Sequence, residues 1–126
     1  MSDCKFVNPR QDESPHMLPW TVGETYRVVD SNCCGGATHN GQAQFAYDFE
    51  MPIGTVIRAS RAGTVLTVEE PFPDYNHTPV EENRVFVRRD DGTDARYYDL
   101  TRGGSLVVPG SSVSTGQATA PSGASG

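Results

Sequence analysis

Lysine, cysteine and histidine are all scarce in this sequence. Lys5 is the only lysine, against nine arginines, and cysteine and histidine occur three times each. The chain therefore has no lysine in its body to form a Schiff base or to carry a biotinyl or lipoyl group. It also contains no run approaching the ~20 apolar residues of a membrane-spanning helix, and residues 1–10 lack the apolar stretch of a secretory signal. We expect no membrane span.

The size and net charge of the chain limit its domain count and the partners it can bind. Its 126 residues suit one domain, and 36% hydrophobic residues with 13 glycines and 9 prolines predict a modest core with many turns. The formal net charge of -6 disfavours binding to nucleic-acid phosphates or anionic membranes. We expect a monomer without a nucleic-acid partner.

The cysteines do not indicate whether the chain belongs to an oxidising or a reducing compartment. Cys33 and Cys34 are adjacent, and their Cα atoms, ~3.8 Å apart, are closer than the ~4.4 to 6.8 Å of an ordinary disulfide. Cys4 could pair with either one in an oxidising compartment, although free buried thiols are the simpler interpretation.

Short β-favouring runs bounded by Gly, Pro, Asn or Asp follow one another along the chain, and no window has a helical period. We expect strands at 26–29, 44–49, 56–59, 64–69, 84–89 and 95–100. Alternation in 64–68 and 84–88 predicts half-buried antiparallel strands. Asp90-Asp91-Gly92-Thr93 predicts a hairpin, and residues 71–82 a long loop. The fold class predicted is all-β, a compact antiparallel sheet or sandwich.

Both ends of the chain have loop-like compositions. Residues 1–19 predict an irregular lead-in, and His16 within it, like His77 in the long loop, is expected to be solvated. The Ser, Thr, Gly, Ala and Pro content of residues 111–126 is typical of a linker. Against this, residues 110–117 place two glycines around a valine, much as Gly54 and Val56 precede Ala59 and Gly63, which hints at a weak internal repeat.

His39 and Asp48 are the polar pair that best suggests chemistry. Asp48 interrupts the apolar run 45–49, so we expect it to be buried and to need backbone N–H donors, a cation or a metal. Imidazole and carboxylate are also half of a common zinc set, in which three protein ligands leave a position for water. Cys33 and Cys34 could complete such a set as thiolates.

Several segments, in order along the chain, are similar to one known family. They are Thr38-His39, 44–65, 83–87, 91–93, 97–100, 107–117 and 122–126. Through them, residues 20–126 resemble the lysostaphin-like (M23) zinc metallopeptidases. The resemblance implies the antiparallel β fold of that family, with His39 and Asp48 as the first two zinc ligands. It also implies an activity on peptide cross-links of bacterial peptidoglycan, and a secreted, periplasmic or envelope location.

Two positions depart from the family pattern. Tyr97-Tyr98-Asp99-Leu100 stands where the family has Tyr-x-His-Leu, so Asp99 occupies the place of a catalytic histidine. The His-x-His strand expected after residues 122–126 is not in the chain. No catalytic residue is therefore assigned, and we expect weak or absent zinc binding. The chain is expected to be either an incomplete, inactive peptidase domain or a degenerate domain that binds cell wall or regulates a partner hydrolase.

Overall fold

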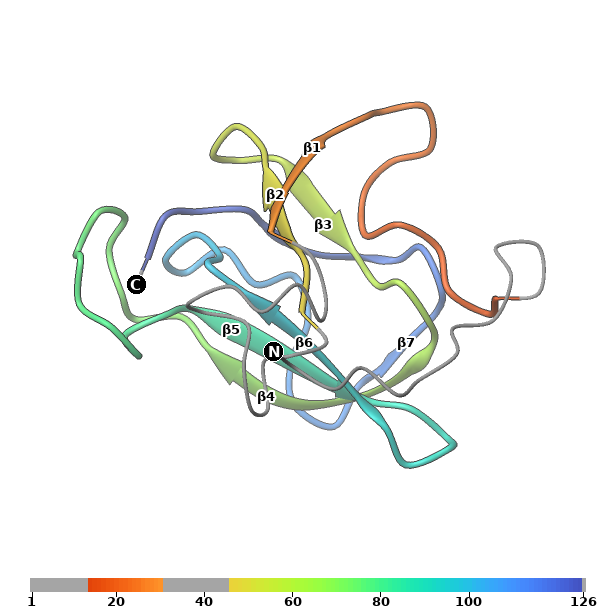
Figure 1. Cartoon of the computed structure of the whole chain (residues 1–126). Coiled ribbons are helices and arrows are strands. Elements are labelled where there is room, and N and C mark those ends of the chain that lie inside the picture. Colours follow the sequence, from red (N-terminus) through yellow and green to blue (C-terminus); the bar gives the residue numbers. More distant parts are fainter. Residues whose placement is uncertain (1–13, 31–45, 126) are drawn as a thin grey trace, which may run out of the picture. The chain divides into compact units, whose positions relative to one another are not determined.

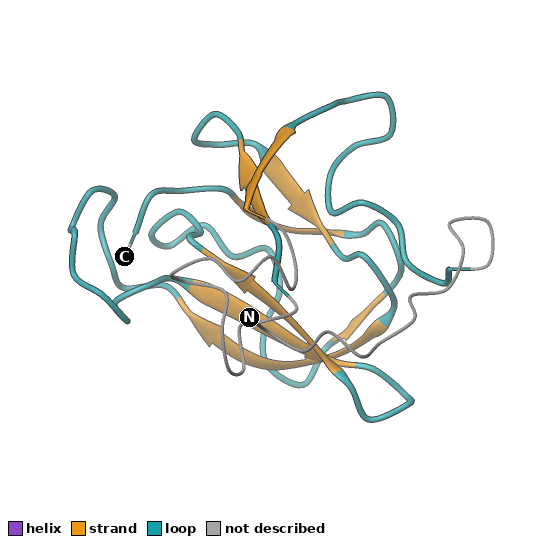
Figure 2. Cartoon of the chain, in the orientation of Figure 1, coloured by secondary structure: helices purple, strands orange, loops and turns teal. Residues whose placement is uncertain are grey.

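The computed structural model describes residues 14–30 and 46–125, and in these ranges the chain forms strands and loops without a helix (Figure 2). No helix long and apolar enough to cross a membrane is found in this part of the chain. The strands are β1 (Arg27–Asp30), β2 (Asp48–Glu50), β3 (Val56–Arg58), β4 (Gly63–Glu69), β5 (Arg84–Arg88), β6 (Asp94–Tyr98), β7 (Ser112–Val113) and β8 (Ala118–Pro121). The predicted all-β antiparallel fold is confirmed.

The chain divides into two compact units. The first comprises Met1–Ser14 and Thr25–Met51, and the second Pro15–Glu24 and Pro52–Gly126. In the described part of the first unit, β1 and β2 form an antiparallel pair. Its register places Arg27 opposite Glu50 and Val28 opposite Phe49, and a bulge follows before the next pair.

The second unit contains two sheets (Figure 1). The four-stranded sheet has the order β6-β5-β4-β7, and β3 pairs antiparallel with β8. The Tyr97 hydroxyl links them, because it accepts a hydrogen bond from the backbone N–H of Ser60, just after β3, at 2.9 Å. The buried apolar side chains of both sheets supply the core, with Ile57, Ala59, Val65, Val85, Val87, Ala95, Val113 and Ala120 among them.

Strands β4 and β5 are half-buried, as their alternation predicts. Val85 and Val87 of β5 are at most 1% exposed, whereas Phe86 between them lies on the opposite, outer face. Val65 of β4 is equally buried, and a bulge between Val65 and Thr67 shifts the pairing with β5. One face of the four-stranded sheet therefore meets the core and the other meets solvent.

The predicted hairpin joins β5 to β6. Gly92 has φ +83°, which an L side chain adopts with strain, and its N–H donates to the Arg89 carbonyl at 3.0 Å. Asp91 accepts hydrogen bonds from the backbone N–H and the hydroxyl of Thr93. These hydrogen bonds, together with a bond from the Arg61 guanidinium, lower the pKa of the Asp91 carboxyl well below its usual range.

The composition of residues 111–126 predicts a linker, and this prediction is wrong. The segment contributes β7 and β8, and Val113, Thr119 and Ala120 are buried. Small side chains and hydroxyls fit a tightly packed interior when each hydroxyl has a partner, and the Thr119 hydroxyl donates to the carbonyl of Ile57 at 2.8 Å. Gly54 and Gly110, which the suggested internal repeat aligns, both have φ near +90°.

Residues 14–19 contain no strand, in agreement with the predicted lead-in. From Pro15 onwards, however, they belong to the second unit. The N–H of Met17 donates to the carbonyl of Ser60 at 2.8 Å, and the carbonyl of Pro19 accepts from the N–H of Arg58 at 2.9 Å. Trp20 then enters the interior at 5% exposure. The domain boundary at residues 19 and 20 stays a prediction.

Candidate metal centre

Asp48, the first residue of β2, is exposed rather than buried, so the expectation that it interrupts a buried strand is wrong. The reason is the topology, because in the described residues β2 pairs only with β1, and a two-stranded ribbon cannot bury a face by itself. Tyr47 and Phe49 stack on the other face of β2, with ring centroids 6.2 Å apart. An exposed carboxylate is hydrated by water. The argument that a buried Asp48 would need a metal or another partner therefore does not apply.

His39, the other predicted ligand, lies outside the described residues, and so do Cys4, Cys33 and Cys34. Across residues 14–30 and 46–125, no three His, Cys, Asp or Glu side chains gather in a way that could hold a metal ion. The described side chains alone therefore do not form a zinc site, and the pairing of His39 with Asp48 stays a prediction.

Asp99 lies one residue beyond β6. Its φ is +59°, in the left-handed region that Asp tolerates better than most residues, so the strand ends at Tyr98 and not at Leu100 as predicted. Leu100 instead forms an isolated bridge with Ser122. The Asp99 side chain is exposed, and its backbone carbonyl accepts from the N–H of Gly123 at 2.6 Å.

Residues 122–125 are held closely beside Asp99. A Cβ added to Gly123 would lie 2.5 Å from the carbonyl oxygen of Leu100 and 2.7 Å from Oδ1 of Asp74, so only glycine fits there. The same Asp74 oxygen accepts from the N–H of Ala124 at 2.7 Å, and the carbonyl of Ala124 accepts from the N–H of Tyr75 at 2.8 Å. The chain segment matching the family's glycine-rich segment is thus fixed against the loop that starts at residue 71.

Asn83, fully buried just before β5, organises the same region. Its Nδ2 donates to the carbonyls of Phe72 and Leu100 at 2.6 and 2.9 Å, and its Oδ1 accepts from the N–H of Phe72 at 2.8 Å. Its backbone N–H donates to the hydroxyl of Ser125 at 2.9 Å. Sequence reasoning gave Asn83 no role. An amide at the entry to an apolar strand was the available signal, since a buried Asn there must find several partners.

The remaining histidines lie in loops, as predicted. His77 is exposed, and its ring lies 6.4 Å from that of Tyr75. His16 is also exposed, but its Nε2 lies 2.6 Å from Nη1 of Arg89, a contact that the solvated-loop interpretation missed. Neither residue belongs to a metal-ligand group in the described part of the chain.

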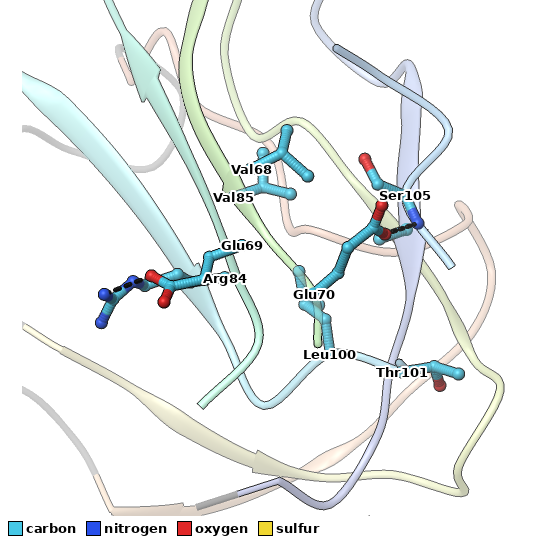
Figure 3. A pocket seen from close by; sticks show the side chains of 9 residues that line it. Val68, Glu69, Glu70, Arg84, Val85, Leu100, Thr101 and Ser105 are labelled. Atoms are coloured by element: carbon cyan, nitrogen blue, oxygen red, sulfur yellow. Dashed lines mark hydrogen bonds and ion pairs between the residues drawn. The ribbon is translucent and has the colours of Figure 1, made fainter. Parts of the chain in front are cut away.

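A shallow depression lies beside β4 and β5, and its side chains do not suggest catalysis. Two contacts occupy it: Glu70 accepts from the N–H of Ser105 at 2.7 Å, and Glu69 forms an ion pair with Arg84 (Figure 3). Its lining contains neither histidine nor cysteine. Both carboxylates already bind protein groups, and the hydroxyls of Thr101 and Ser105 donate to the carbonyls of Ser122 and Val107.

The fold is similar to those of two solved bacterial proteins. One is a zinc-containing peptidase from Vibrio cholerae, with TM-score 0.62 and 22% identity over 86% of this chain. The other, from Pseudomonas aeruginosa, is assigned to peptidase family M23 and has TM-score 0.52 and 25% identity over 88% of this chain. The chain has the fold of the M23 peptidases. The resemblance stated from the sequence is thereby confirmed at the level of the fold.

The M23 likeness covers most of this chain but a smaller part of the two relatives. The matched region is 32% of the Vibrio protein and 42% of the Pseudomonas protein. No family model matches the sequence, and no curated protein matches it. The fold therefore rests on the structural comparison, and zinc is named only for the Vibrio peptidase.

Proposed function

We propose that this chain is an M23-type peptidase domain directed at the peptide cross-links of bacterial peptidoglycan, outside the cytoplasm, and that it does not cleave them as it stands. The structural likeness to the two peptidases, together with the order of the matching sequence segments, supports the assignment. His39 and Asp48 are the proposed zinc ligands, and two ligands, one fewer than a catalytic zinc site uses, would hold the metal weakly.

The observation that supports inactivity is Asp99. Hydrolysis of a peptide bond develops negative charge on the carbonyl oxygen, and a positioned donor stabilises that charge. An ionised carboxylate at the position of the family's imidazole has no proton to donate and repels the developing anion. The Asp99 side chain is exposed and directly follows the end of β6.

Asp99 also supports a second candidate, a degenerate domain that binds the cell wall or a partner hydrolase without cutting. In that case neither His39 nor Asp48 needs a metal. The two candidates differ in one measurable property: wall binding through a zinc-linked site is sensitive to a chelator, and wall binding by a degenerate surface is not.

Cosedimentation of the 126-residue protein with purified peptidoglycan tests the proposal. We expect binding to peptidoglycan with intact peptides and much weaker binding to glycan strands from which the peptides have been removed. EDTA, or the variant Asp48→Ala, weakens binding if the zinc-linked site takes part. Equal binding to the stripped glycan, or no binding to either material, contradicts the proposal.

Release of new amino termini, measured in the same samples, tests inactivity. We expect none from the wild-type protein with added zinc. Zinc-dependent release that is lost in His39→Ala would show that the chain is an active peptidase despite Asp99.

A further inference from the structure

An arginine and aromatic cluster covers the outer face of strands β5 and β6. The register places Phe86 opposite Arg96 and Arg84 opposite Tyr98, so all four side chains lie on the same face. The guanidinium carbon of Arg96 lies 4.9 Å from the centre of the Phe86 ring and that of Arg84 lies 5.8 Å from it. The ring of Tyr98 meets Phe86 edge to face at 5.6 Å.

The arginines of this face differ in whether they form ion pairs with carboxylates of the described residues. Arg84 forms an ion pair with Glu69, and Arg88, further along β5, forms one with Asp94. Arg96 is exposed, and among residues 14–30 and 46–125 no carboxylate forms an ion pair with it. Its contact with Phe86 restrains the guanidinium while leaving the N–H groups at its edge available for a ligand.

The position of β6 determines the shape of a ligand that could use this cluster. In the described residues β6 is the outermost strand of the four-stranded sheet, and an extended peptide can lie alongside such a strand. Arg96 and Tyr98 are two residues apart, so their side chains are separated by about 6.7 Å along the strand. Alternate side chains of an extended peptide have the same spacing.

We propose that this face binds an extended peptide that carries an acidic residue and, two positions away, an apolar residue. The carboxylate pairs with Arg96, and the apolar side chain packs against Tyr98, which is 40% exposed, and Phe86. A densely charged polyanion suits the surface less well, because the chain has a net charge of -6 and two of the three arginines on this face already neutralise carboxylates. None of these residues is a predicted zinc ligand, so the inference does not depend on the proposed peptidase function.

A fluorescent peptide of sequence Thr-Glu-Thr-Leu-Thr, with its termini blocked, is the probe, and the same peptide with Gln in place of Glu is its control. We expect the Glu peptide to bind the full chain about 2- to 5-fold more tightly than the Gln peptide, since an exposed ion pair adds only a modest gain in affinity. Raising the salt concentration should reduce this difference, because the pair is exposed.

Variants then locate the contact. Arg96→Gln should lose the preference for Glu, and Arg96→Lys should keep only part of it, because lysine lacks the planar fork. Arg102→Gln, at an exposed arginine in the loop after β6, is the matched control and should bind like the wild type. Unfolding temperatures of the variants verify that they fold. No binding up to 1 mM peptide (about -4 kcal/mol), or an unchanged Glu preference in Arg96→Gln, overturns the inference.

Discussion

The Nε2 atom of His16 lies 2.6 Å from Nη1 of Arg89 and joins the segment before Trp20 to the end of the β5 strand region. Because a guanidinium only donates hydrogen bonds, Nε2 is the acceptor and the imidazole is neutral in this contact. Partial burial, then the charges of Arg89 and Arg61, lower the pKa of His16 below 6.5, and the carboxylate of Asp91 opposes them. Protonation of His16 therefore works against this contact.

Stability should consequently fall on acidification through the titration of His16. Since the folded pKa lies below the unfolded value of 6.5, the unfolded state takes up the proton first. The contribution is present above about pH 6.5 and is lost as the pH falls through the lower folded pKa. The ring is exposed, so the loss should stay under about 1 kcal/mol. Urea unfolding at several pH values measures it.

His16→Gln is the control for this titration, because the amide oxygen still accepts from Arg89 but does not titrate. The two proteins should have similar stability above pH 6.5, and the wild type should become the less stable of the two as the pH falls below that value. Parallel stability curves for the two proteins across this range would show that the contact does not titrate.

Asn83→Ala should destabilise the second unit by roughly 3 kcal/mol. It removes three side-chain hydrogen bonds and leaves backbone groups of Phe72 and Leu100 without them in the interior. Asn76→Ala, which loses a solvent-exposed hydrogen bond to the carbonyl of Glu81, is the matched control and should cost less than about 1 kcal/mol. Thermal or urea unfolding measures both. Similar losses would mean that Asn83 does not organise the region.

Gly123→Ala should destabilise the region around Asp99, because its Cβ would meet the backbone of Leu100. We expect a loss of about 2 kcal/mol or more, typical of overpacking against backbone. Gly110→Ala is the comparison, since Gly110 has φ +87° but open space around its Cβ position. Its cost should be about 1 kcal/mol, from backbone strain alone. Unfolding experiments rank the two, and a larger loss in Gly110→Ala would contradict the packing argument.

Much of the fold could be predicted from local patterns. The alternation around Val85 and Val87 and the turn glycine Gly92 determine the β5 and β6 hairpin, and the structure confirms it. The end of β6 could not be predicted, because the left-handed φ of Asp99 depends on its contact with Gly123, 24 positions away. The linker predicted from the composition of residues 111–126 is wrong. Composition does not show whether a hydroxyl, such as that of Thr119, has a buried hydrogen-bond partner.

The candidate site was less accessible from the sequence. The burial of Asp48 was inferred from its apolar neighbours, but burial also depends on what covers the β1 and β2 ribbon. The cluster around Phe86 has a partial signal in the alternation of residues 84–88. Only the cross-strand register places Arg96 against Phe86, because register depends on pairing and not on either strand alone.

The zinc content of the purified protein tests the central proposal, that His39 and Asp48 are zinc ligands and hold the metal only weakly. After dialysis against metal-free buffer, the account predicts much less than one zinc per chain in the wild type. It also predicts weak zinc binding on titration, which disappears in His39→Ala and in Asp48→Ala. One zinc per chain retained through dialysis and lost in His39→Ala would contradict it.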